Sequence, residues 1–298
     1  MPIYDLTYRG YRGERAKSPS FLPVVENTIR LALRNKILRS IYYAAGAPVV
    51  VAIVFLYVRY QIEASVMAQR GRSSMRLPFA FEIENYYWFL FSQGMLALVL
   101  AAVVGASAIG GDRRGNALEA IFSRPITLTQ YLIGRWLGLF TLVLAATLVP
   151  GFLLWCFDNA FSLDPDRLVK TLSYPCRIAA WAVVQGASVS LLVLAFSALI
   201  SRAGIAMATF AAFFFLSSAF TNGVAAAVER VSEPTAEIIR SFGFVEAHRA
   251  VQLLIFGVAK RDVHLEVNPT SSCIVLSALA LFCIWVLYRR VRPIEVVS

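Results

Sequence analysis

The stretch Trp136–Phe157, WLGLFTLVLAATLVPGFLLWCF, contains no charged side chain and is apolar on every face of a helix. Roughly 20 apolar helical residues cross a bilayer core about 30 Å thick, so this stretch predicts a transmembrane helix. Five further windows share its character, and the full set is Ile41–Tyr60, Tyr86–Ile109, Trp136–Phe157, Ile178–Ile200, Ala203–Thr221 and Thr270–Tyr288. We therefore expect an all-α polytopic membrane protein with six transmembrane helices.

The composition of the 298-residue chain agrees with this class. Hydrophobic residues make up 58% and charged residues 15%, and the mean hydropathy is +0.66. Soluble domains are about half apolar and a quarter charged, so a soluble domain is excluded, as are disordered, collagen-like and disulfide-stapled secreted chains. The apolar runs are continuous rather than alternating, which excludes a transmembrane strand barrel. No small-residue cleavage site follows the first window, so we expect a retained span rather than a signal peptide.

The distribution of charge predicts the orientation. An even number of spans, six, places both termini on the same side of the membrane. The segments expected on that side are residues 1–40, 110–135, 201–202 and 289–298. These segments hold 16 of the 28 Lys and Arg residues but only 6 of the 18 Asp and Glu residues, so the whole net charge of +10 lies there. The positive-inside rule makes that side cytoplasmic. The basic residues flank spans without a binding motif, so we expect contacts with membrane lipids and no nucleic-acid partner.

The chain divides into three parts. Residues 1–20 are polar and basic and predict a cytoplasmic leader. In residues 21–39, apolar side chains recur every three or four positions between basic ones: Leu22, Val25, Ile29, Leu33 and Ile37. This pattern predicts an amphipathic helix in the cytoplasmic membrane interface. Residues 40–298 form the six-helix domain, in which the exterior segment 222–269 contains short apolar stretches that predict re-entrant or interfacial helices, or a small exterior cap.

The cytoplasmic loop 110–135 reads GGDRRGNALEAIFSRPITLTQYLIGR. Three glycines are expected to break the end of the second span: Gly110, Gly111 and Gly115. Asn116 is expected to cap a short helix, with Glu119 at the third helical position returning to the cap. We expect that helix to end at Ser123, because a residue before proline, here Arg124, disfavours helical geometry.

This short helix is predicted to expose an apolar face formed by Leu118, Ile121 and Phe122. Charged residues surround that face: Arg113, Arg114, Glu119 and Arg124. Exposed apolar surface costs about 25 cal/mol per Å² in water, so the face should dock a partner protein or lie on the membrane interface. The sequence leaves both open. Thr127 or Thr129 is expected to cap the third span.

The run GDRRGNALEAIFSRPIT at 111–127, followed by YLIGR at 131–135, closely resembles the coupling loop of type 2 ATP-binding-cassette (ABC) exporter permeases. The matching positions are Asp112, Gly115, Leu118, Glu119, Ser123, Arg124, Pro125, Gly134 and Arg135. Asn116-Ala117 departs from the more usual threonine of the family. The basic helix before the first span looks like the family's elbow helix. The short inner turn between spans four and five and the long outer segment before span six also match its layout.

The resemblance implies a concrete function. The chain would be the permease subunit of a bacterial exporter in the cytoplasmic (inner) membrane, paired with a second permease chain as a homodimer or heterodimer. Separate cytoplasmic ATP-binding subunits would contact the coupling residues, which are Asp112, Arg113, Gly115, Leu118, Glu119, Ile121, Phe122, Arg124 and Pro125. The sequence contains no Gly-x-x-x-x-Gly-Lys-Ser/Thr pattern, so ATP-Mg would be bound and hydrolysed by the partner subunit. We expect no cofactor in this chain and no catalytic residue.

A substrate pathway would lie between the two permease chains. Its candidate residues are polar groups of the second and fifth spans and one aromatic ring that could act as a gate: Ser92, Gln93, Phe214, Ser217, Ser218 and Asn222. Serine in a membrane helix often bonds its own backbone, and a phenylalanine run often faces lipid, so each residue also has an ordinary structural interpretation. No ionisable side chain lies deep in a span, which argues against an ion-coupled transporter.

Two other classes compete with the exporter. A membrane scaffold for an assembly or signalling complex would also use a docking helix. An integral-membrane enzyme would need a motif such as His-Glu-x-x-His or Gly-x-Ser-x-Gly, and the sequence has neither. Two histidines are too few for a metal site of their own. A Cys156–Cys176 bridge is left open, and so are the transported substrate and any accessory subunit.

Overall fold

The structure is a computed structural model that describes residues 21–70, 82–123, 126–260, 262–263 and 265–291; the predicted leader 1–20 lies outside them. The described residues form helices and no strand. The helices are α1 (Leu22–Arg34), α2 (Lys36–Arg70), α3 (Ile83–Gly105), α4 (Gly110–Arg114), α5 (Ala117–Phe122), α6 (Leu128–Ala160), α7 (Arg167–Lys170), α8 (Tyr174–Leu199), α9 (Ala203–Glu229), α10 (Glu233–Arg240), α11 (Phe244–Phe256) and α12 (Pro269–Arg290). Six of them, α2, α3, α6, α8, α9 and α12, are long and apolar enough to cross a membrane. The predicted all-α polytopic fold is confirmed.

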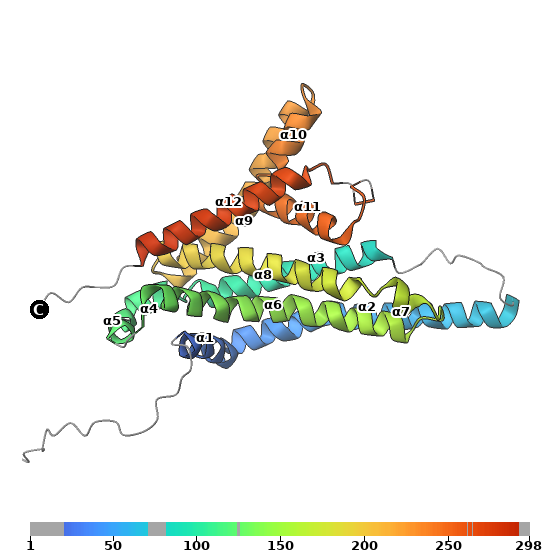
Figure 1. The fold of residues 1–298 in the computed structure, drawn as a ribbon, viewed down its shortest axis with the longest axis horizontal. Helices are drawn as coiled ribbons and strands as arrows, with labels where there is room; N and C mark the ends of the chain where they lie inside the picture. The colour runs from blue at the N-terminus through green and yellow to red at the C-terminus, as the bar shows by residue number, and fades with distance from the viewer. Residues whose placement is uncertain (1–20, 71–81, 124–125, 261, 264, 292–298) are drawn as a thin grey trace, which may run out of the picture.

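The long helices α3, α6 and α8 form the centre of the bundle (Figure 1). In their most apolar windows, 61% of α8, 50% of α3 and 44% of α6 is buried, against only 17% of α2 and of α9. Apolar side chains that a monomer leaves exposed on α2, α9 and α12 suit contact with lipid or with another membrane chain. The short helices α4 and α5 lie at one end of the bundle, and α7 lies at the opposite end (Figure 1).

The segment 222–269, predicted to be exterior, begins inside a helix, because α9 continues to Glu229. Its two helices differ in placement: α10 projects beside the end of α9, whereas α11 is buried against α3, α8, α9 and α12 (Figure 1). Most of the short apolar stretch 251–258 therefore lies in α11. Neighbouring helices, rather than lipid, cover the buried apolar side chains of this helix. All four cysteines are free.

The amphipathic segment before the first span is helical, but its helix is shorter than 21–39. Asn35 has an extended backbone with φ −73° and ψ 120°, so α1 ends at Arg34 and α2 begins at Lys36. The face of α1 that is buried on the bundle consists of Val24, Thr28 and Ala32. Three residues of the predicted apolar face are exposed, as expected for a face turned toward lipid: Leu22 and Leu33 of α1, and Ile37 in the first turn of α2. The helix thus has one face on the bundle and a second apolar face left for lipid.

Candidate functional site

The loop between α3 and α6 is fixed to the C-terminal end of α8. The backbone N–H groups of Ile109 and Gly110 donate to Ser197 Oγ at 3.0 and 3.1 Å, and Ser197 Oγ donates to the carbonyl of Ala106 at 2.9 Å. A single buried hydroxyl therefore satisfies three backbone groups where α3 stops being helical. The turn that follows α3 is therefore fixed against α8.

The three loop glycines do not break the span as predicted. The helix ends at Gly105, and Gly110 and Gly111 lie inside the next helix, α4. Gly110 is needed for close approach, since a Cβ there would lie 2.7 Å from the carbonyl oxygen of Ile200. Gly115 does follow α4, as its C-terminal cap. The glycines indicated that the helix of the second span would end near this loop, but tertiary packing determines the residue at which it ends.

Asp112 of α4 is the centre of a buried polar network. Its Oδ2 accepts a hydrogen bond from Tyr131 Oη at 2.6 Å and forms an ion pair with the Arg135 guanidinium. Arg135 Nη1 donates to Thr28 Oγ1 at 3.1 Å, and Thr28 Oγ1 donates to the carbonyl of Val24 at 2.8 Å. Arg135 is only 5% exposed, so it depends on these partners for its charge to be tolerated. The network joins α4, α6 and α1.

Two glycines of α6 let α1 approach closely. A Cβ at Gly134 would lie 2.7 Å from the Val24 Cβ, and a Cβ at Gly138 would lie 2.7 Å from the Thr28 Cβ. Small residues four positions apart on membrane helices allow backbones to pack against each other. Any larger side chain at either glycine must push α1 away from Arg135. The helix α1 is therefore fixed against α6 by packing as well as by hydrogen bonds.

The apolar face of α5 points inward, so the prediction that it is exposed is wrong. Leu118 is only 6% exposed, and Ile121 and Phe122 are partly buried against the main core. The ring of Phe122 packs edge-to-face on Tyr131, with ring centroids 5.7 Å apart. The helical periodicity correctly identified the face, but the bundle itself covers it. The outward edge of α5 is small and polar instead: Asn116, Glu119, Ala120 and Ser123 are exposed.

The capping predictions have mixed outcomes. Asn116 precedes α5 in the left-handed region, with φ 49°, and its side chain makes no capping hydrogen bond, so the predicted Asn116–Glu119 box is wrong. Thr127, one of the two alternatives, does cap α6: its Oγ1 accepts from the Gln130 N–H at 3.3 Å, and the Gln130 side chain accepts from the Thr127 N–H at 3.0 Å. Arg124 and Pro125 lie outside the described residues. Arg113 does not point freely outward, because Nη2 donates to the Arg290 carbonyl at 3.2 Å.

The pathway candidates in α3 have structural partners. Ser92 is exposed, and its hydroxyl donates to the Phe89 carbonyl of its own helix at 2.7 Å. Gln93 is fully buried and donates from Nε2 to the Ala45 carbonyl of α2 at 3.1 Å. The two residues therefore do not line a common surface.

The candidates in α9 divide in a similar way. Phe214 is buried with its ring against Phe244 of α11, and Ser217 donates to its own helix. Ser218 Oγ and Asn222 Nδ2 both donate to the carboxylate of Glu246 in α11, each at 2.7 Å. This carboxylate, which sequence reasoning missed, brings two of the six pathway candidates together.

A buried histidine lies on the same helix as Glu246. His248 Nε2 is 2.7 Å from the Ser188 hydroxyl, and Nδ1 is 2.8 Å from the Phe244 carbonyl. Burial lowers the pKa of His248 to about 4, so the ring is neutral at pH 7. A neutral ring with both nitrogens partnered fixes α11 to α8. Among the described residues, no three His, Cys, Asp or Glu side chains could hold a metal ion together.

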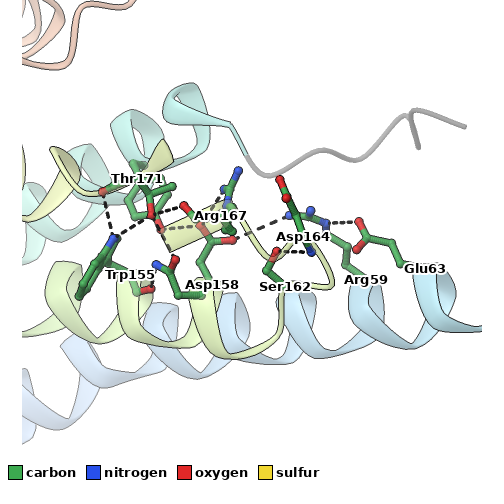
Figure 2. Close-up of polar contacts among 10 residues, drawn as sticks. Arg59, Glu63, Trp155, Asp158, Ser162, Asp164, Arg167 and Thr171 are labelled. Atoms are coloured by element: carbon green, nitrogen blue, oxygen red, sulfur yellow. Dashed lines mark hydrogen bonds and ion pairs between the residues drawn. The ribbon is translucent and has the colours of Figure 1, made fainter. Parts of the chain in front are cut away.

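A second ion network lies at the opposite end of the bundle (Figure 2). Asp158, in the last turn of α6, forms an ion pair with Arg167 Nη2 at 2.7 Å and accepts from Tyr86 Oη at 2.9 Å. Arg59 of α2 lies between two carboxylates, 2.7 Å from Glu63 and 3.9 Å from Asp158. Arg59 and Asp158 therefore connect α2, α3, α6 and α7 at the end of the bundle opposite α4 and α5. The helix α6 carries one such network at each end.

Comparison with known proteins adds no assignment. A scan against models of protein families finds no match, and a search of curated proteins finds no significant relative. The features that bear on function are therefore the loop sequence and the geometry at the N-terminal end of α6.

Proposed function

We propose that this chain is the permease subunit of an ATP-binding-cassette exporter, and that α5 is the helix through which a separate ATPase drives it. The proposal combines the resemblance of the loop 110–135 with one structural observation. Both helices of the loop are attached to the bundle. Asp112 of α4 is bonded to Arg135 of α6, which donates to Thr28 of α1, and α5 packs on α6 through Phe122 and Tyr131. A force applied to α5 is therefore transmitted to transmembrane helices rather than absorbed by the loop.

The exposed edge of α5 determines what a partner would contact. Since Leu118 and Phe122 are used by the bundle, the docking surface is Glu119, Ala120 and the adjoining polar residues. A small side chain beside a carboxylate allows close approach of a partner helix with a basic donor. This surface is small, so the second contact of the ATPase would come from nearby exposed basic side chains such as Arg114.

The proposed location is the bacterial inner membrane, with both termini and α5 in the cytoplasm. The excess of Lys and Arg at this end supports that orientation. ATP-Mg would be bound by the partner, and the energy of its binding would shift the chain between an inward-facing and an outward-facing state. Two copies, or this chain and a related one, would pair through the exposed apolar faces of α2 and α9, which leave enough apolar surface for a membrane interface.

The proposal is tested by purifying the full chain from its native membrane in mild detergent. An ATPase with a Walker A motif should copurify, and reconstitution with the chain should change its hydrolysis rate. Ala120→Arg should abolish copurification because it adds bulk and charge to the exposed edge without touching the core. Glu26→Ala is the matched control, since Glu26 is exposed on α1 at the same end and forms only a surface pair with Arg30.

The outcomes separate the competing classes. Loss of the ATPase in Ala120→Arg and retention in Glu26→Ala support the coupling role. An ATPase that copurifies equally with both variants contradicts it. An ATPase that binds through α5 but whose hydrolysis is unchanged by the chain favours the scaffold over the exporter.

A further inference from the structure

A groove lies between the C-terminal ends of α8 and α12. Its volume is about 590 Å³, and its lining residues are Leu199, Phe282, Trp285, Val286, Arg289 and Arg290. The three largest apolar side chains are open to the surroundings: Leu199 is 44%, Phe282 58% and Trp285 52% exposed. The volume is in the range of small-molecule sites, and four of the six lining residues are apolar.

The open end of the groove is positively charged. Arg289 and Arg290 are both exposed, and within the described residues neither forms an ion pair with a carboxylate. The Arg289 guanidinium lies over the Trp285 ring, 5.1 Å from its centroid. Arg113 brings a third guanidinium to this end through its 3.2 Å bond to the Arg290 carbonyl. The neighbouring carboxylate, Asp112, is already neutralised by Arg135.

The groove therefore has an apolar part and a cationic part, arranged like the acyl chains and the headgroup of a phospholipid. Phe282 and Arg289 are seven residues apart on one helix, which corresponds to about 10 Å along the helix axis. Arginine at the last turn of a span reaches the headgroup layer, and a ring about 10 Å deeper lies among acyl chains. Phe282 and Trp285 stack with centroids 5.8 Å apart, which gives a flat wall for a chain.

We propose that this groove is a binding site for an anionic phospholipid of the leaflet at the basic end of the protein. The headgroup phosphate binds Arg289 and Arg290, and one acyl chain lies along Phe282, Trp285 and Leu199. The proposal needs only that the chain spans a membrane, so it is tested separately from the exporter assignment. Because Arg113 links α4 to the last turn of α12, the lipid also braces the end of the bundle that carries α5.

The test uses the full chain reconstituted in vesicles that contain brominated phosphatidylglycerol or brominated phosphatidylcholine. Quenching of Trp285 is isolated as the difference between the native chain and Trp285→Phe. We expect phosphatidylglycerol to be preferred at this tryptophan by roughly fivefold for each arginine that contributes. The double variant Arg289→Gln/Arg290→Gln should reduce that preference to near one. The matched control Arg34→Gln/Arg202→Gln removes two exposed arginines at the same end, outside the groove, and should keep it.

Three results overturn the proposal. Equal quenching by the two lipids shows that the groove holds ordinary annular lipid. Equal loss of preference in both double variants shows a general surface charge rather than a site. A preference that emerges only after deletion of residues 292–298 assigns the groove to the chain's own tail. Soluble glycerol phosphate should not compete, because it lacks the acyl chain that the aromatic wall binds.

Discussion

Breaking the Asp112–Arg135 pair tests whether the loop is rigidly attached to the bundle. Asp112→Ala leaves a guanidinium that is 5% exposed without its carboxylate, with only the neutral partners Thr28 and Tyr131 beside it among the described residues, and it removes the acceptor of Tyr131. Removing one partner of a buried pair typically costs about 3 to 5 kcal/mol. The Asp112 side chain is 17% exposed, so the lower figure, about 3 kcal/mol, is expected.

A double-mutant cycle gives the sharper measurement. Arg135→Met alone also destabilises the protein, since it leaves the Asp112 carboxylate without its cation. In the double variant Asp112→Ala/Arg135→Met no buried charge of this pair remains, and replacement of a whole pair by apolar groups is often close to neutral. We therefore expect a coupling energy of about 3 kcal/mol or more, favourable to the intact pair.

The assay is equilibrium unfolding of the full chain in mixed micelles, with the free energy of unfolding compared across the four members of the cycle. The exposed pair Glu26–Arg30, whose side chains are 67% and 63% exposed, provides a control cycle with an expected coupling below about 0.5 kcal/mol. If the effects of the two single changes on the free energy of unfolding add to within about 0.5 kcal/mol, the two side chains are not coupled. That result would refute the transmission of force through this pair.

Three other parts of the structure give further predictions. Gly138→Leu should destabilise the protein by about 1 to 3 kcal/mol and separate α1 from α6 in a cysteine cross-linking assay, whereas Gly204→Leu, which meets nothing within 4 Å, should do neither. Because the pKa of His248 is lowered to about 4 by burial, the unfolded chain binds more protons between pH 6.5 and 4. The free energy of unfolding should then fall by up to about 3 kcal/mol as the pH drops through that window, and His248→Asn should flatten the dependence. Asp158→Asn removes the carboxylate that pairs with Arg167 and lies near Arg59. It should lower the free energy of unfolding by about 2 kcal/mol or more in the same unfolding assay.

The six spans could be predicted because bilayer thickness imposes a long apolar run, and such runs are unambiguous in sequence. Helix ends were harder. Thr127 caps α6 as one of two predicted alternatives, since a threonine three residues before a glutamine is a local signal. The end of α3 was misplaced because it depends on Ser197, which is distant in sequence and gives no local sign.

The candidate site was predicted in part. The loop residues were identified, but periodicity reveals only that α5 has an apolar face, not what covers that face. Thr28 was hidden in an apolar pattern that pointed to other positions of α1. One signal was available: Gly134 and Gly138 are four residues apart in α6, a spacing that predicts close packing of another helix. The hydrogen bonds from Ser218 and Asn222 to Glu246 join α9 to α11 across the intervening α10, and sequence spacing alone does not specify such a contact.

The central claim is that the outward edge of α5 is held by a nucleotide-driven subunit in the cytoplasm. A photo-reactive amino acid at position 120, in place of the exposed Ala120, tests this claim most directly in intact cells. The account predicts a cross-link from position 120 to a protein with a Walker A motif, whose yield changes when ATP is depleted. Cross-links only to lipid, or labelling of the Ala120→Cys variant at that position by a membrane-impermeant maleimide added outside the cell, would contradict it.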